Sequence, residues 1–124
     1  MAKKLSKPSH ADLTPGLWLG TEAGWNLYEA AVHEAAEHMA RGGSFEDMVP
    51  PLLSVQDNVG IVSISGPLVT GDAGFFRLFG VTGYSNVADS LVEAVQNGKV
   101  SSIVLAIDSP GGHVNGVQEL ATLI

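Results

Sequence analysis

A run of six residues, Asp108-Ser-Pro-Gly-Gly-His113, holds the residue types best suited to chemistry. Paired glycines leave backbone N–H groups open to a ligand, because no Cβ blocks its approach. We expect the run between a buried strand and a helix, whose N-terminus adds partial positive charge. Such a corner suits a phosphate, or the oxyanion formed when a carbonyl is attacked. The alternative is an ordinary tight turn, in which Asp108 and Ser109 hydrogen-bond local backbone and fix the corner.

Nucleotide-binding motifs and a serine triad fit this run poorly. The dinucleotide fingerprint G-x-G-x-x-G follows the first strand of its unit, whereas Gly111, Gly112 and Gly116 follow the second predicted strand. No Gly-Lys-Ser/Thr follows these glycines, which excludes a P-loop. Ser109 precedes a proline and lacks a surrounding G-x-S-x-G elbow. A Ser109–His113 pair of nucleophile and base is therefore disfavoured.

A second group of titratable residues, His33-Glu-Ala-Ala-Glu-His38, resembles a zinc-protease helix only superficially. Two histidines bind one metal when they lie at i and i+4 on a helix. Here they are five apart, and position i+4 from His33 is Glu37. His33 with Glu37, and Glu34 with His38, are better interpreted as surface pairs. We predict no metal site and no cofactor.

The N-terminal part outside the first helix predicts little regular structure. Residues 1–20 carry prolines without periodicity and predict an extended arm, which Leu17 and Trp18 are expected to fix to another part of the molecule. Residues 44–58 predict a linker, because Pro50-Pro51 forbids a continued helix.

Residues 22–41 predict an amphipathic helix. Thr21 suits the N-cap position, and Gly42-Gly43 suits the end of the helix. Apolar residues recur at spacings of three and four, which places them on one stripe. They are Trp25, Tyr28, Val32, Ala35, Ala36 and Met39.

The second half of the chain predicts two strands that alternate with two helices. The predicted elements are a strand over 59–65, a helix over 85–97 with Ser85 as N-cap, a strand over 100–107 and a helix over 114–124. This order favours a parallel sheet with a right-handed crossover. The second strand is almost entirely apolar, as expected when both faces of a strand are covered. The last helix carries an apolar stripe that stops without a cap, which predicts a face buried against another chain or further residues.

A glycine-rich loop is predicted over 68–83, and it carries Phe75, Phe76 and Phe79. These rings either form an apolar flap or subunit contact, or they fill core space beneath the loop.

Composition narrows the class of protein. The 124 residues contain no cysteine, which excludes disulfides and thiolate metal sites and favours a cytoplasmic origin. Three of the six basic residues lie in the first seven positions. The rest of the chain therefore carries only three basic residues but all 13 acidic residues. Such a surface repels phosphate, and we expect no nucleic-acid partner. No apolar run approaches the length of a membrane span, so we expect no membrane partner.

Residues 59–124 resemble the N-terminal half of the catalytic domain of signal peptide peptidase A-like serine proteases, in particular their phage head-maturation (capsid protease) branch. The matching segments are Val59-Gly-Ile-Val-Ser-Ile-Ser-Gly-Pro67, Tyr84, Val100-Ser-Ser-Ile-Val-Leu-Ala-Ile-Asp-Ser-Pro-Gly-Gly112 and Val114-Asn-Gly-Val-Gln-Glu-Leu-Ala121. The second strand with its Gly-Gly is the specific part of the match. The resemblance covers slightly over half of the chain.

The resemblance implies an α/β fold of the Clp protease/crotonase type, here an incomplete parallel βαβα unit preceded by an N-terminal helical arm. It implies two parts: an arm, helix and linker over 1–58, and the first half of a protease domain over 59–124. Gly111 and Gly112 would supply oxyanion-hole N–H groups, and His113-Val114 would flank the substrate peptide as an added strand.

The same family works by a serine that attacks the peptide carbonyl and a lysine that accepts its proton. No position of this chain matches either residue, so we expect an inactive, truncated portion of the enzyme. The implied partners are a protein or peptide substrate, further copies of the chain in a homo-oligomer, and capsid or scaffold proteins. Two alternatives stay open: a non-catalytic assembly or interaction module based on the Trp25/Tyr28 stripe, and a fragment of a crotonase-like acyl-CoA enzyme.

Overall fold

The structure, a computed structural model, describes residues 17–42 and 49–124. Most of the arm predicted over 1–20 therefore lies outside the described residues. The elements in chain order are β1 (Trp18–Gly20), α1 (Glu22–Ala40), β2 (Leu53–Gln56), β3 (Val59–Ser65), β4 (Leu68–Val69), the 3-10 helix η3 (Gly74–Phe79), β5 (Thr82–Gly83), α2 (Tyr84–Gln96), β6 (Ser102–Asp108), β7 (Gly111–His113) and α3 (Val117–Leu123).

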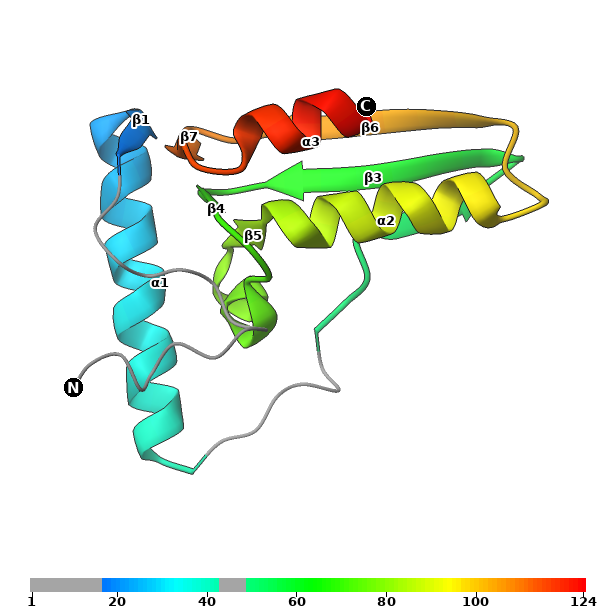
Figure 1. Ribbon diagram of the computed structural model, residues 1–124. Coiled ribbons are helices and arrows are strands. Elements are labelled where there is room, and N and C mark those ends of the chain that lie inside the picture. The colour runs from blue at the N-terminus through cyan, green and yellow to red at the C-terminus, as the bar shows by residue number, and fades with distance from the viewer. Residues whose placement is uncertain (1–16, 43–48) are drawn as a thin grey trace.

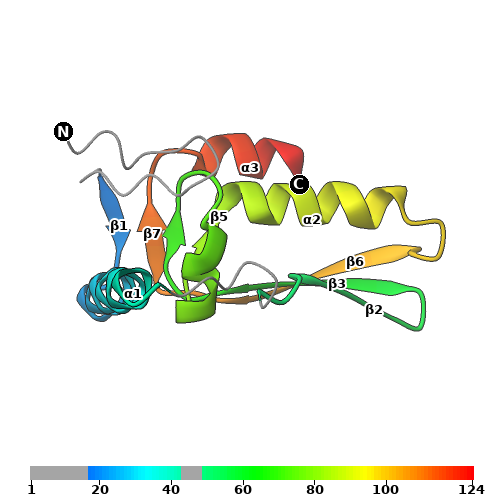
Figure 2. The same ribbon diagram turned by 90° about the horizontal axis from the view of Figure 1, so that it is seen from below.

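The strands form two sheets, of order β2-β3-β6 and β1-β7-β4-β5. Strands β3 and β6 are parallel, and α2 connects them, which confirms the predicted crossover unit. Helices α2 and α3 lie together on one face of the first sheet (Figure 2). Helix α1 runs across the end of the molecule beside β1 and β7 (Figure 1). The second sheet thus lies between α1 and the crossover unit.

Helix α1 packs on its own chain rather than presenting a free apolar stripe. It begins as predicted at Thr21, whose Oγ1 accepts a hydrogen bond from the Gly24 N–H at 2.9 Å. The buried face consists of Gly24, Tyr28, Ala31 and Ala35. The predicted stripe was wrong in part, because Ala36 and Met39 are exposed. Tyr28, Ala31 and Ala35 form one core cluster with Val69, Ala73, Phe76 and Val81.

The linker predicted over 44–58 was wrong where it meets β3. Residues Leu53–Gln56 form β2, which pairs antiparallel with β3 through a two-residue turn. Asp57 and Asn58 adopt φ values of +50° and +66° in this turn. Both residue types tolerate the left-handed region, which a tight hairpin turn requires. The Asp57-Asn58 pair is therefore a sequence signal for a hairpin turn.

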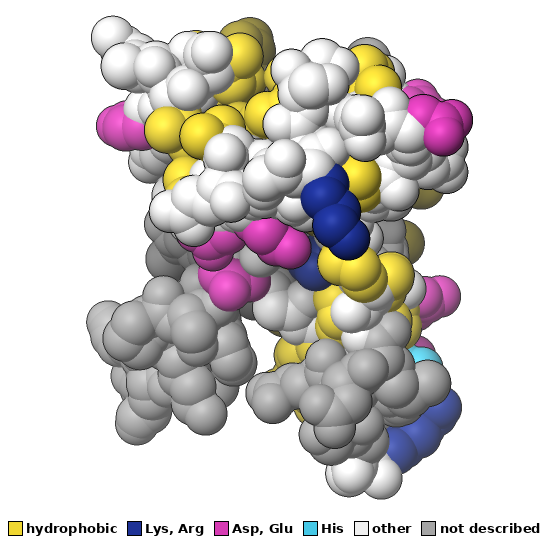
Figure 3. Space-filling model, turned by 90° about the vertical axis from the view of Figure 1, so that its right-hand side faces the viewer, with side chains coloured by type: hydrophobic (Ala, Val, Ile, Leu, Met, Phe, Trp, Pro, Cys, Tyr) yellow, Lys and Arg dark blue, Asp and Glu magenta, His cyan; other side chains and the backbone are white. Residues whose placement is uncertain are grey.

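Strand β6 is covered on one face only, which contradicts the prediction that both faces are buried. Val104 and Ala106, which point away from the helices, are exposed, Val104 at 49%, whereas Ile103 and Leu105 pack against the core on the helix side. Helices α2 and α3 cover one face of the sheet, and no described residue covers the other (Figure 2). The end of the molecule shown in Figure 3 likewise exposes hydrophobic side chains, with dark blue basic side chains near the centre and at the lower right of the view. The apolar stripe of α3 also stays partly open, since Val117 is 45% exposed.

The start of α2 differs from the prediction by two residues. The N-cap is Gly83 rather than Ser85. The Asn86 side-chain oxygen accepts hydrogen bonds from the N–H groups of Gly83 and Ala73, each at 3.0 Å. The Asn86 amide, three residues after the cap, thus reaches back to the N–H of the cap residue itself and also holds the preceding segment at Ala73.

The glycine-rich segment 68–83 is more regular than the predicted loop, because it contains β4, η3 and β5. Phe76 lies buried in the α1 core cluster, and Phe75 and Phe79 pack partly buried against it. The rings of Phe75 and Phe76 stack with centroids 4.8 Å apart. The core interpretation of these rings therefore describes the structure better than the flap.

Candidate functional site

The turn after β6 is fixed by Ser109. Its hydroxyl donates to the Gly66 carbonyl oxygen at 2.7 Å and accepts from the Gly111 N–H at 3.2 Å. The Gly66 N–H in turn donates to the Asp108 carbonyl oxygen at 3.0 Å. The local-turn interpretation of Ser109 is thereby confirmed. The hydroxyl is engaged with backbone and joins the turn to the end of β3.

Gly111 and Gly112 lie in a short strand rather than directly at a helix N-terminus, which corrects one expectation. They belong to β7, and α3 begins only at Val117 after the left-handed Gly116, whose φ is +100°. The reason is that β7 has a strand partner on each side, β1 and β4. The partial charge of α3 therefore does not lie immediately behind the two glycines. The Gly111 N–H donates to the Ser109 hydroxyl, and Gly112 faces β1 in the strand pair.

Close backbone approach on both sides of β7 explains why two glycines occur together. A Cβ at Gly111 would lie 2.3 Å from the Leu19 carbonyl oxygen, and φ at Gly111 is +108°. A Cβ at Gly112 would lie 2.0 Å from the Leu68 carbonyl oxygen. Gly111 thus admits β1 on one side, and Gly112 admits β4 on the other.

The outer edge of β7 pairs with β1 in antiparallel register, with Leu19 opposite Gly112 and Trp18 opposite His113. The Val114 N–H donates to the Leu17 carbonyl oxygen at 3.0 Å, and the Thr21 N–H donates to the Pro110 carbonyl oxygen at 3.0 Å. Hydrogen-bonded positions alternate along an antiparallel pair, so Leu19 and Gly112 occupy the hydrogen-bonded position between these two bonds. The edge predicted to take a peptide therefore holds residues 17–21 of the chain itself.

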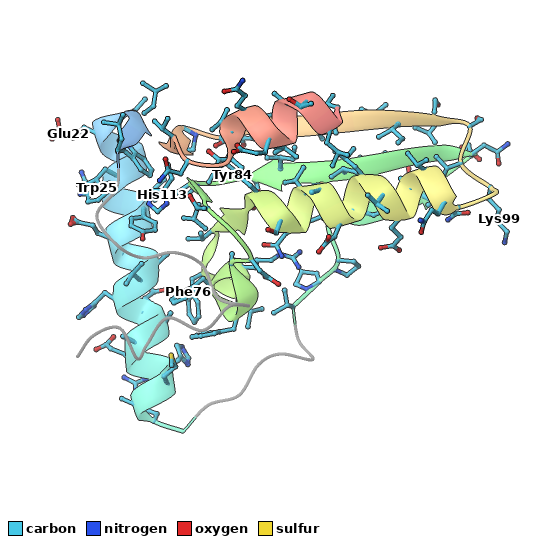
Figure 4. All side chains as sticks on the ribbon, viewed as in Figure 1. Glu22, Trp25, Phe76, Tyr84, Lys99 and His113 are labelled. Atoms are coloured by element: carbon cyan, nitrogen blue, oxygen red, sulfur yellow. The ribbon has the colours of Figure 1, made fainter. Side chains whose placement is uncertain are left out.

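The side chain of His113 is buried at 5% exposure instead of lying at the mouth of the turn. Its ring contacts the rings of Tyr28 and Trp18, with centroid distances of 5.4 Å and 6.2 Å. Its Nδ1 accepts from the Thr70 N–H at 3.5 Å. Figure 4 shows His113 between the top of α1, where Trp25 is labelled, and the start of α2, where Tyr84 is labelled. His113 thus joins the candidate site to the aromatic side chains of β1 and α1.

Sequence reasoning missed the role of Tyr84. Its hydroxyl donates to the His113 carbonyl oxygen at 2.5 Å and so fixes β7 to the start of α2. Its ring also explains Gly116, where a Cβ would lie 2.9 Å from the Tyr84 Cδ2 atom. Burial raises the pKa of the Tyr84 phenol above its usual value. An isolated tyrosine before a helix carried no local signal for this contact.

We expect Tyr84→Phe to lower the free energy of unfolding by about 1–2 kcal/mol at neutral pH, because the His113 carbonyl loses its donor. A raised phenol pKa means that folding favours the protonated form. This contribution is therefore present below the ordinary tyrosine pKa and is lost as the pH rises through the raised value. Urea denaturation of both proteins at neutral pH and in strong base measures the difference. A gap between the two proteins that does not shrink in base would contradict this account.

The His33–Glu37 pair on α1 is a surface feature, as predicted, whereas the His38 ring packs on that of Phe79 with centroids 5.2 Å apart. His33 Nε2 lies 3.9 Å from Glu37 Oε1, and both side chains are exposed. Within residues 17–42 and 49–124, no three His, Cys, Asp or Glu side chains gather in a metal-binding arrangement. No helix in that part of the chain is long and apolar enough to cross a membrane.

Over 70 residues the chain is 31% identical to the capsid assembly protease C of Escherichia phage lambda. The chain is related to a phage capsid protease. It is also 31% identical over 70 residues to the head-tail preconnector protein of Enterobacteria phage P21. Each match covers 56% of this chain, but only 16% of the lambda protein and 14% of the P21 protein. No protein-family model matches the chain, and no solved structure matches it significantly.

These similarities support the relationship to phage capsid proteases that the resemblance of residues 59–124 implied. The wider assignment to signal peptide peptidase A-like proteases stays a prediction. The same holds for the Clp/crotonase fold and for the roles of Gly111, Gly112, His113 and Val114 in substrate binding.

Proposed function

We propose that this chain forms the oxyanion-hole part of a Ser–Lys serine endopeptidase that cleaves capsid or scaffold proteins during phage head maturation. The observation that carries the proposal is the pairing of the Gly-Gly strand β7 with an extended segment along its outer edge. Similarity to a phage capsid assembly protease supports it. The proposal includes a Clp/crotonase-like fold, assembly into a homo-oligomer, and action in the host cytoplasm or the procapsid.

In this proposal the substrate peptide binds along β7 as an antiparallel strand. The residue opposite Gly112 brings its carbonyl group to the Gly112 N–H, as the register places Leu19 there. When a serine attacks that carbonyl, the N–H stabilises the negative charge that develops on oxygen, and a lysine takes the serine proton. In the family that this chain resembles, the serine and the lysine occupy positions that have no counterpart in this chain. The chain alone is thus expected to bind peptide without cleaving it.

Substitutions in the polypeptide that the intact gene encodes test this function. We expect cleavage of its capsid or scaffold protein, seen on a denaturing gel, to survive Ser109→Ala, because Ser109 is engaged with backbone. Gly112→Val keeps the backbone N–H, but its side chain would collide with the Leu68 backbone and displace that N–H. The rate should then fall at least ~100-fold, about the effect of losing one oxyanion donor. Circular dichroism of each variant shows whether it has folded.

Two results would contradict the proposal. Turnover of a fluorogenic peptide by the 124-residue chain, abolished in Ser109→Ala, would make Ser109 the nucleophile. Hydrolysis of an acyl-CoA ester without any cleavage of protein by the intact gene product would favour the crotonase-like alternative. The protease is preferred over a pure interaction module because the Tyr28 face of α1, on which that alternative rested, packs within the chain.

A further inference from the structure

Strand β1 has the position and direction that the proposed function gives to a substrate. It runs antiparallel to β7, and its ladder extends from the Leu17 carbonyl at Val114 to the Thr21 N–H at Pro110. Leu19 occupies the place opposite Gly112, where the proposal puts the carbonyl that is attacked. A chain segment far from β7 in sequence thus fills the edge through main-chain pairing, as an added peptide strand does.

The side chains of this segment are weakly held. Leu17 is 71% exposed and Leu19 is 74% exposed, so neither contributes much burial. Strand β1 is the last strand of its sheet, and none of the described residues pairs with its outer side. Trp18 is the exception, because it is half-buried against the core cluster of α1. Backbone pairing and one aromatic side chain therefore hold the segment on β7.

The Trp18 side chain packs against the rings of Trp25, Tyr28 and His113, which we call the aromatic floor. Its ring centroid lies 5.2 Å from that of Trp25, 6.0 Å from that of Tyr28 and 6.2 Å from that of His113. Tyr28 and His113 are buried and belong to α1 and β7, so the floor does not depend on β1. Edge-on and tilted arrangements at such distances are favourable for aromatic pairs. Departure of β1 would expose a surface that fits a large aromatic side chain.

We propose that residues 17–21 are a tethered occupant of the substrate edge, which a substrate displaces in order to bind. The inference rests on the proposed function and adds the chemistry of the substrate. The displacing segment is an extended peptide with an aromatic side chain opposite His113, on the floor of Trp25, Tyr28 and His113. Because α1 begins at Glu22, directly after the occupant, the tether is short and the local concentration of the occupant is high. Free peptide therefore competes poorly with the intact chain.

Binding of a fluorescein-labelled peptide, Leu-Trp-Leu-Gly-Thr, to the 124-residue chain tests the proposal by fluorescence anisotropy. Leu19→Pro removes a donor at the hydrogen-bonded position and inserts a ring toward β7. We expect this variant to bind the peptide at least ~10-fold more tightly than wild type. Leu19→Ala is the matched control: it removes an exposed side chain, retains the ladder and should bind like wild type. The same peptide with Gly in place of Trp should bind Leu19→Pro at least ~10-fold more weakly.

Equal binding to wild type, Leu19→Ala and Leu19→Pro would overturn the tethered occupant, as would no binding to a folded Leu19→Pro variant. If Leu19→Pro does not fold, hydrogen exchange of wild type with saturating peptide decides. The Thr21 N–H should then lose protection while the Val114 N–H keeps it, because the peptide replaces the Leu17 carbonyl; continued protection of Thr21 overturns the proposal. Cleavage by the intact gene product is measured in a separate experiment. The proposed protease function can therefore hold even if the tethered-occupant proposal is overturned.

Discussion

Gly112→Ala is expected to lower the free energy of unfolding by about 3 kcal/mol or more, a large part of a typical total of about 5–15 kcal/mol. The added Cβ would lie 2.0 Å from the Leu68 carbonyl oxygen and 2.7 Å from the Leu68 nitrogen. Both are backbone atoms of β4, which cannot move aside as a flexible side chain can. Strands β7 and β4 must therefore separate, and their pairing is lost. Urea denaturation followed by circular dichroism measures the change.

Gly98→Ala is the matched control for this experiment. Among the residues that the structure describes, nothing lies within 4 Å of a Cβ at Gly98, which follows the end of α2. The same chemical change should there be neutral or stabilising by up to about 1 kcal/mol, since alanine has less backbone freedom in the unfolded chain. A Gly112→Ala protein as stable as Gly98→Ala would mean that β4 does not approach β7 as described.

Phe76→Ala is expected to cost about 3–5 kcal/mol of folding free energy, because it opens a cavity in the core beneath α1. Phe76 is 7% exposed and lies in one cluster with Tyr28, Ala35 and Val69. Its ring also stacks on that of Phe75. Thermal and urea denaturation measure the loss. The substitution should loosen α1, whose contact with η3 runs through this cluster.

Leu27→Ala serves as the comparison, since Leu27 lies on α1 and is 58% exposed. It should cost less than about 1 kcal/mol. A Phe76→Ala variant that unfolds like Leu27→Ala, and that loses only peptide binding or self-association, would favour the apolar flap instead. The two interpretations of the phenylalanines therefore predict different observables.

The crossover unit could be predicted from the sequence because its signals are local. A β-branched run bounded by Gly66-Pro67 predicted β3, and apolar spacing predicted α2. Its order of elements then favoured the parallel pairing with β6 that is observed. The Thr21 cap is local in the same sense. The prediction that both faces of β6 are covered was wrong, because the coverage of a sheet depends on residues elsewhere in the chain.

The pairing of β1 with β7 could not be predicted from the sequence. Each strand has three residues, too few for a period of two to be recognised, and Trp18 and His113 lie far apart in the chain. The paired glycines indicated that another backbone segment or a ligand lies close to them, but the pattern does not show which segment it is. In the structure Gly111 meets Leu19 and Gly112 meets Leu68, so the motif that predicted an oxyanion hole is also required by packing.

Amide chemical-shift mapping of the ¹⁵N-labelled chain during titration with the Leu-Trp-Leu-Gly-Thr peptide tests most directly whether β7 is a peptide-binding edge. Strand β6 is an alternative binding edge, because it ends the other sheet and none of the described residues pairs with its outer side. We expect the largest shift changes at Gly111–Val114, with changes at residues 17–21 as they leave β7. Changes centred on Ser102–Asp108, or none at β7 in a folded Leu19→Pro chain with peptide in excess, would contradict the account.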